Sequence, residues 1–400
     1  MENPKIRFKG FTKDWEQRKL GDVFKEYSEK NHTELSALTI IQGGGTVKRE
    51  DSDRNLMYDT SNLSNYKMVR KDDFIVHLRS FEGGLEKSSL DGIISPAYHT
   101  FHSDMADSRF YYPYFRSYEF IKHKLVSHVY GIRDGRSIDI DGMKTIEIPY
   151  TSIEEQRKIG DYLDCLDHLI TLHQRKCEQT KNLKKYMLQK MFPQNGAKVP
   201  EIRFNGFTHD WEQRKLGDMG STYTGLSGKT KEDFGHGDAK FITYMNVFSN
   251  PVANLDMTES VEIDSKQNCV KAGDVFFTTS SETPEEVGMS SVMPENADNI
   301  YLNSFCFGYR PTEKFDLNYL AYVLRTESFR KEMTFLAQGI SRYNISKNKV
   351  MEVEIPIPSL DEQSRVGQYF KNLDTLITLH QRKCDELKKM KKFMLQNMFI

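Results

Sequence analysis

Histidine and cysteine occur twice at a spacing that could bind a metal ion. His173 and Cys177 are four residues apart, as are His380 and Cys384, so each pair would lie on one face of a helix. Two such pairs on neighbouring helices could supply the four nitrogen and sulfur ligands of a Zn²⁺ site. A buried seam that uses histidine to fix its register explains the same residues. We expect this structural role and predict no metal site.

Other patterns that could carry chemistry are incomplete. The glycines of "QGGGT", residues 42–46, could approach a phosphate, but no lysine follows, so we expect a flexible loop. The "DIDG" stretch at 139–142 lacks the later acidic ligands of a calcium loop and is expected to be a turn. The sequence contains no GxxxxGK[ST], no Gly-rich cofactor turn and no NPPY- or DPPY-like methyltransferase motif. We therefore expect a non-catalytic chain that binds no cofactor itself.

The elements that would carry functional residues are present in two copies. The stretch "FTKDWEQRKLGD" at 11–22 returns as "FTHDWEQRKLGD" at 207–218, and "LITLHQRKC" at 169–177 returns at 376–384. A third stretch, "YMLQKMF" at 186–192, returns as "FMLQNMF" at 393–399. A repeat about half the chain long is typical of a head-to-tail duplication of a domain with its linker.

Each copy contains a predicted helix of about forty residues, on the order of 60 Å long at 1.5 Å per residue. Apolar or semi-apolar residues recur at alternating spacings of four and three, broken only at Lys184 and Lys391, which is the heptad pattern of a coiled coil. In the two copies these positions are Ile159, Leu163, Leu166, Ile170, His173, Cys177, Thr180, Met187 and Met191, and Val366, Phe370, Leu373, Ile377, His380, Cys384, Leu387, Met394 and Met398. The first helix begins acidic and the second ends basic, so we predict antiparallel pairing of the two helices. Complementing each helix dipole is the alternative explanation of this charge pattern.

The sequences before the two helices diverge. Short β-rich runs alternate with glycine and polar turns, and a helical segment precedes the last of them, so each body is predicted to be mixed α/β. The predicted fold is therefore two globular α/β domains joined by two long antiparallel coiled-coil helices, with an internal pseudo-twofold repeat. The predicted boundaries are 1–22 for the first repeated segment, 23–150 for the first body, 151–193 for the central helix, 194–218 for the linker and second repeated segment, 219–357 for the second body and 358–400 for the C-terminal helix.

Composition limits the function classes. A chain of 400 residues with 38% hydrophobic residues can bury two cores. It contains no run of 18 apolar residues and no apolar N-terminal signal, so we expect no membrane association and a cytoplasmic location. The five cysteines include no CxxC pair, which indicates neither a disulfide framework nor a zinc ribbon. Because the net charge is -1, any nucleic-acid binding must come from local basic patches.

The double "DWEQRKLGD", followed each time by a variable body and a long helix that contains "LITLHQRK", resembles the specificity subunits of type I restriction-modification systems. The resemblance covers essentially the whole chain. It implies that each body is a target recognition domain that reads one half of a split sequence in double-stranded DNA. It also implies that the helices space the bodies and dock two modification subunits, which carry S-adenosylmethionine, and that restriction subunits join the full complex.

Polar and basic residues in corresponding loops are the candidate DNA contacts, because Arg can grip guanine, and Asn or Gln adenine, through two hydrogen bonds. These residues are His77, Arg79, Ser80, Arg133 and Arg136 in the first body, and Thr279, Ser280, Ser281, Gln338, Ser341, Arg342, Tyr343 and Asn344 in the second. A loop Arg at such a position could equally contact phosphate or only solvent.

Trp15 and Trp211, the only tryptophans, both lie in the repeated segment. We predict that they anchor the modification subunits; packing against their own domain is the alternative. Two other functions are compatible with parts of the sequence. A coiled-coil adaptor would bind protein partners through its two bodies, and a self-sufficient methyltransferase would need the cofactor motifs that are missing.

Overall fold

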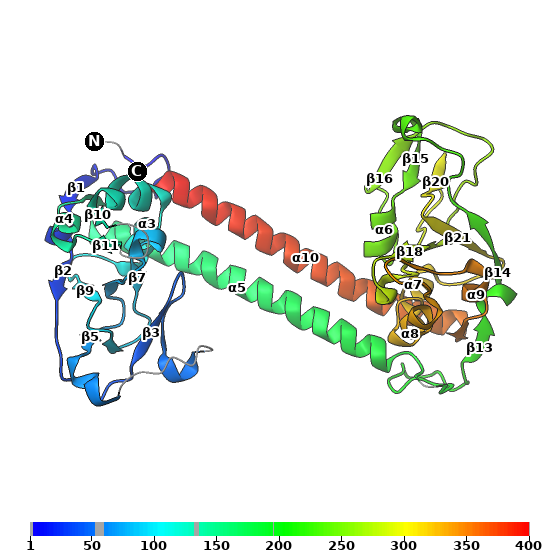
Figure 1. Ribbon diagram of the computed structural model, residues 1–400, viewed down its shortest axis with the longest axis horizontal. Helices are drawn as coiled ribbons and strands as arrows, with labels where there is room; N and C mark the ends of the chain where they lie inside the picture. The colour runs from blue at the N-terminus through cyan, green and yellow to red at the C-terminus, as the bar shows by residue number, and fades with distance from the viewer. Residues whose placement is uncertain (1–2, 53–59, 132–135, 195, 400) are drawn as a thin grey trace. The chain divides into compact units, whose positions relative to one another are not determined.

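The computed structural model describes residues 3–52, 60–131, 136–194 and 196–399. The chain forms two compact units (Figure 1). The first unit consists of Met1–His173 and Arg382–Ile400, and the second of Gln174–Gln381. Each unit therefore contains one globular body together with parts of both long helices, α5 (Ile153–Lys190) and α10 (Leu360–Met398).

The first unit contains short helices and strands around one main sheet. Its strands are β1 (Glu16–Lys19), β2 (Lys25–Tyr27), β3 (Leu38–Ile41), β4 (Gly45–Lys48), β5 (Lys67–Val69), β6 (Phe74–Val76), β7 (Glu86–Lys87), β8 (Gly92–Ile94), β9 (His99–His102), β10 (Val129–Tyr130), β11 (Ser137–Ile138) and β12 (Glu147–Tyr150). Its short helices are α1 (Leu20–Val23), α2 (Ser80–Gly83), α3 (Ser108–Phe115) and α4 (Ile140–Lys144). The main sheet has the antiparallel order β2-β9-β6-β7.

The second unit repeats this plan with an additional sheet. Its strands are β13 (Glu212–Lys215), β14 (Gly220–Thr224), β15 (Phe234–Ile242), β16 (Thr258–Val261), β17 (Val275–Thr278), β18 (Ser280–Ser281), β19 (Ser290–Val292), β20 (Ile300–Leu302), β21 (Cys306–Pro311), β22 (Tyr343–Asn344) and β23 (Glu354–Ile357). Its short helices are α6 (Tyr244–Ser249), α7 (Leu317–Val323), α8 (Glu327–Leu336) and α9 (Lys347–Met351). The sheet β14-β21-β17-β19 corresponds to the main sheet of the first unit, and β16-β15-β20 forms a separate sheet.

The repeated "EQRK" stretch forms a strand in both units. β1 pairs antiparallel with β12, and β13 pairs in the same way with β23. The partner strand is in each case the "EIP" segment that leads into the long helix. The pairing therefore holds each repeated segment beside the strand that leads into a long helix, which explains why both sequences recur together.

The long helices are antiparallel within each unit. In the first unit, Leu166 and Ile170 of α5 form a buried cluster with Cys384 and Leu387 of α10, and Lys391 contacts Asp167 at 2.5 Å. In the second unit, Lys184 contacts Asp374 at 2.5 Å. Early residues of one helix thus meet late residues of the other, which confirms the predicted orientation.

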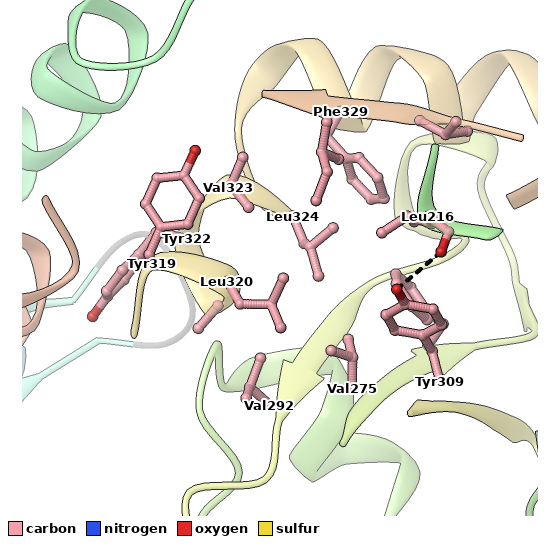
Figure 2. Packing of buried hydrophobic residues seen from close by; sticks show 14 of the residues in the cluster. Leu216, Val275, Val292, Tyr309, Tyr319, Leu320, Tyr322, Val323, Leu324 and Phe329 are labelled. Carbon is pink, nitrogen blue, oxygen red and sulfur yellow. Dashed lines mark hydrogen bonds between the residues drawn. The ribbon is translucent and has the colours of Figure 1, made fainter. Parts of the chain in front are cut away.

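The core of each unit includes the end of one long helix. Met191 and Phe192 pack in the second core and Met398 in the first, which accounts for the repeated "MLQKMF" and "MLQNMF" stretches. Figure 2 shows part of the second core, where the Tyr309 hydroxyl donates a hydrogen bond of 2.9 Å to the carbonyl oxygen of Leu216. Among the described helices, none is both long enough and apolar enough to cross a membrane.

The residues considered for metal binding have structural neighbours. Cys177 is buried, and its sulfur lies 3.8 Å from the carbonyl oxygen of Ile377. Cys384 belongs to the apolar cluster on α5 and α10. Within the described residues, no group of three or more His, Cys, Asp or Glu side chains is arranged to hold a metal ion.

The "QGGGT" loop binds a side chain of its own unit. The backbone N–H groups of Gly43 and Gly45 donate to the carboxylate of Glu86, at 2.7 and 3.3 Å. Glu86 is fully buried and also accepts hydrogen bonds from Tyr112 and Arg116. The loop is therefore anchored rather than loose, and these two donors are already used by a carboxylate.

Candidate nucleic-acid interface

A buried ionic cluster holds the repeated segment of each unit against its long helix. In the first unit, Arg7 donates to both carboxylate oxygens of Glu155, at 2.6 and 2.8 Å, and the Trp15 indole N–H donates to the same group at 3.2 Å. The hydrogen bonds to Glu155 raise the pKa of Arg7. In the second unit, Arg203 and Trp211 make the equivalent bonds to Glu362.

The two tryptophans of this cluster are the residues predicted to anchor a partner. Trp15 and Trp211 are only 1% and 2% exposed, so neither indole offers surface to a partner in this conformation. Their burial favours the alternative role, packing of the repeated segment against its own domain. The acids Glu155 and Glu362, which the sequence analysis did not select, complete the cluster. Their sequence signal is that both lie in the first turn of a long helix and are followed by Gln at equivalent positions of the repeat.

The candidate DNA contacts of the first unit lie around the short helix α2. The Ser80 hydroxyl accepts a hydrogen bond of 2.9 Å from the backbone N–H of His77, and Ser80 is fully buried. Arg79 is exposed and contacts Glu82 at 3.0 Å. The Arg136 guanidinium lies over the ring of Phe81, 4.7 Å from its centre. Segments more than fifty residues apart in the sequence thus meet at α2.

His77 is held in one orientation. Its Nδ1 accepts from the backbone N–H of Arg79 at 3.3 Å. Burial is the main cause that lowers the pKa of His77, which favours a neutral ring. Arg133, also predicted as a DNA contact, lies outside the described residues.

In the second unit, the two predicted loops are joined by strand pairing. β18 pairs with β22, so that Ser280 is opposite Asn344 and Ser281 is opposite Tyr343. The backbone N–H of Ile345 also donates to the carbonyl oxygen of Thr279 at 3.0 Å. We call this arrangement of residues 279–281 and 338–345 the second reading cluster.

The predicted contact residues differ in exposure. Ser80, Ser280 and Ser281 are buried, and His77, Thr279 and Tyr343 are half-buried. The exposed members are Arg79, Arg136, Gln338, Ser341, Arg342 and Asn344. The serines therefore shape the loops, while the exposed side chains face solvent. Ser281 illustrates this, since its hydroxyl donates to Glu286 at 3.0 Å.

Two half-buried arginines of the second unit, Arg325 and Arg330, donate hydrogen bonds to backbone carbonyl oxygens. Arg330 donates to the carbonyl oxygens of Glu285, Val287 and Gly288, at 2.5–2.7 Å. Arg325 binds the carbonyl oxygens of α6 and β19 in a similar way. Burial lowers the pKa of Arg330 to about 10. The sequence analysis missed both residues because an arginine is normally expected to face solvent.

A second apolar stripe on the long helices is exposed. Leu183 and Tyr186 of α5 lie in the second unit, and Met390 and Phe393 of α10 lie in the first. All four side chains are about half exposed, and the two pairs occupy the same positions of the repeat. Neither pair belongs to the buried seam, so each unit presents one equivalent apolar patch on a helix.

Comparison with known proteins identifies the family. The sequence matches the family model described as "Type I restriction modification DNA specificity domain" twice, over residues 12–182 and 208–389. The chain belongs to this family, and the two matches coincide with the two copies of the repeat.

Individual relatives agree with this assignment. The chain is 27% identical over 268 residues to the type I restriction enzyme MjaVIII specificity subunit of Methanocaldococcus jannaschii, covering 64% of this chain and 61% of the relative. It is 23% identical over 189 residues to the StySPI specificity subunit of Salmonella potsdam, covering 46% of this chain and 38% of the relative. The matches thus span less than two thirds of the length of these curated relatives.

Solved structures show the same fold. The HsdS subunit from Thermoanaerobacter tengcongensis has a TM-score of 0.50 at 20% identity, with 96% of both chains covered. The type I restriction-modification S subunit from M. genitalium has a TM-score of 0.59 at 14% identity, with 100% of this chain and 99% of that chain covered. These likenesses confirm the predicted fold class of two α/β domains with long helices.

Proposed function

We propose that this chain is the DNA-sequence reader of a type I restriction-modification complex. Each body reads one half of a bipartite target in double-stranded DNA. The observation that carries the proposal is that the family match occurs twice, on two units with the same scaffold and different loop residues. A common frame with different loops suits two readers of different half-sites.

The exposed side chains support base recognition by each unit. Arg79 and Arg136 in the first unit and Arg342 in the second are suited to the guanine edge, and Gln338 and Asn344 to the adenine edge. The positive charge of the three arginines also suits contacts with phosphate groups. Because the net charge of the whole chain is -1, binding to phosphate must come from such local basic patches. The buried serines would act by holding these loops in shape rather than by touching bases.

The proposed role is non-catalytic. Methyl transfer and its cofactor, S-adenosylmethionine, would be supplied by two modification subunits, and DNA cleavage by restriction subunits that join the full complex. The proposal is supported by the absence from the sequence of methyltransferase and nucleotide-binding motifs. The helices would set the distance between the half-sites, and the domain boundaries predicted above would mark the exchangeable parts.

The exposed helix patches favour docking of two equivalent partners. Leu183 with Tyr186, and Met390 with Phe393, present apolar surface at identical positions of the repeat. Apolar side chains spaced three residues apart on a helix suit the apolar face of a partner helix. Because the chain contains the patch twice, it could hold two copies of one modification subunit.

The experiment that tests this function compares the methylation pattern of a genome with and without the chain, in cells that also contain the modification subunit. We expect a split motif that is methylated only when the chain is present. A protein adaptor of the coiled-coil type would leave the methylation pattern unchanged, and this outcome would contradict the proposal.

A further inference from the structure

The second reading cluster contains a tight hairpin with an exposed isoleucine at its tip. The backbones of Gln338 and Asn344 exchange two hydrogen bonds, of 2.9 and 2.8 Å, which close the loop between them. Gly339 has a positive φ of 155°. A Cβ atom at this glycine would lie 2.0 Å from the carbonyl oxygen of Arg342, so the turn requires glycine.

The hairpin divides its apolar residues between two environments. Ile345 is buried in the core of the second unit, and Tyr343 packs against that core. Ile340 is 95% exposed, the highest value among the large apolar side chains of the described residues. Local packing is thus already satisfied by Tyr343 and Ile345, and the geometry of the turn keeps Ile340 in solvent.

The tip is presented on a fixed base. β22 pairs with β18, and Ile345 bonds to Thr279, so the hairpin continues from a buried part of the unit. The major groove of DNA admits a two-stranded β-ribbon, and the 5-methyl group of thymine is the one apolar group on its base edges. Ser341 and Arg342, which follow Ile340, are exposed hydrogen-bonding residues suited to neighbouring positions.

We propose that Ile340 is a specificity-determining residue that contacts the methyl group of a thymine in the half-site read by the second unit. This inference rests on the proposed function and adds a base identity to it. Contact between this exposed isoleucine and the methyl group removes apolar surface from water, which makes binding more favourable. Cytosine lacks the methyl group, so the contact should stabilise binding less there.

The test removes the methyl group from the DNA. The probe is a duplex carrying the motif found by methylation mapping, in which each thymine of this half-site is replaced in turn by uracil. Binding is measured with the complex of the chain and its modification subunits. At one position, we expect uracil to weaken binding by about fourfold, the effect of burying one methyl group.

The variant Ile340→Ser should weaken binding to the thymine duplex by a similar factor and should abolish the difference between thymine and uracil. Ile263→Ser is the matched control, because Ile263 is also in the second unit and is 54% exposed; this variant should retain the difference. Equal binding of every uracil duplex by the unmodified chain, or a difference that persists in Ile340→Ser, would overturn the inference. Failure of the unmodified complex to bind the thymine duplex would instead contradict the proposed function.

Discussion

The indole nitrogen of Trp211 lies 3.1 Å from a carboxylate oxygen of Glu362, and both side chains are buried. Arg203 donates to both oxygens of the same carboxylate. The equivalent cluster in the first unit has the same residue types. The repeated "DWEQRKLGD" segment is thus retained in both copies for a structural reason, the attachment of a strand to the first turn of a long helix.

We predict that Glu362→Gln destabilises the second unit by roughly 2–3 kcal/mol, because it removes the counter-charge of the half-buried Arg203 guanidinium. The measurement is the free energy of unfolding in denaturant. Arg214→Gln is the matched control. It breaks a more exposed ion pair with Glu313 and should destabilise the unit much less than Glu362→Gln, because exposed ion pairs contribute little. Equal effects of the two variants would contradict the structural role of the cluster.

The repeat, the long helices and their antiparallel order could be predicted from the sequence. The repeat is visible as recurring stretches, the helices as heptad spacing, and their order as the distribution of charge along them. Contacts between residues far apart in the sequence could not be predicted. Nothing local indicates that Ser280 pairs with Asn344, or that Arg330 turns inward to bind backbone carbonyl groups. The exposure of individual loop residues could not be predicted either. Ser80 is buried, whereas its neighbour Arg79 is exposed.

A second prediction concerns pH. His102 in the first unit binds the buried Asp73, where the second unit has Arg310 bound to Asp274. The hydrogen bond to Asp73 is the main cause that raises the pKa of His102. A raised folded-state pKa means that the stabilisation is complete below the unfolded value of about 6.5 and is lost as pH rises through the folded value.

His102→Arg, which copies the second unit, should therefore make the stability of the first unit less dependent on pH between roughly 6 and 8. Unfolding free energies measured across this range provide the check. His236→Arg, in the second unit, should leave the pH dependence of the first unit's stability unchanged, because this residue lies outside the first unit. If His102→Arg retained the full dependence of the unmodified chain, another group would be responsible.

A third prediction concerns the exposed helix patches. Met390→Ser with Phe393→Ser should remove one docking surface, and the complex should then carry one modification subunit instead of two. The pair Leu183→Ser with Tyr186→Ser should have the same effect through the other patch, because the positions are equivalent in the repeat. Native mass spectrometry gives the stoichiometry. A folded variant that still holds two partners tightly would exclude its patch from the interface.

A fourth prediction tests the helices as a spacer. Insertion of seven residues into both α5 and α10 keeps the heptad seam and lengthens each helix by roughly 10 Å, or about three base pairs. The two halves of the methylated motif should move apart by about that number. Insertion into one helix alone breaks the pairing of the seam and serves as the control. A folded, active double insertion with an unchanged motif would show that the helices do not determine the spacing.

The central claim is that each unit reads its own half of a split DNA sequence. It is tested most directly by replacing residues 23–149 with the corresponding body of another specificity subunit and mapping methylated bases across the genome. We predict a new motif in which one half has changed and the other half is retained. A change in both halves, or retention of the original motif, would contradict the claim.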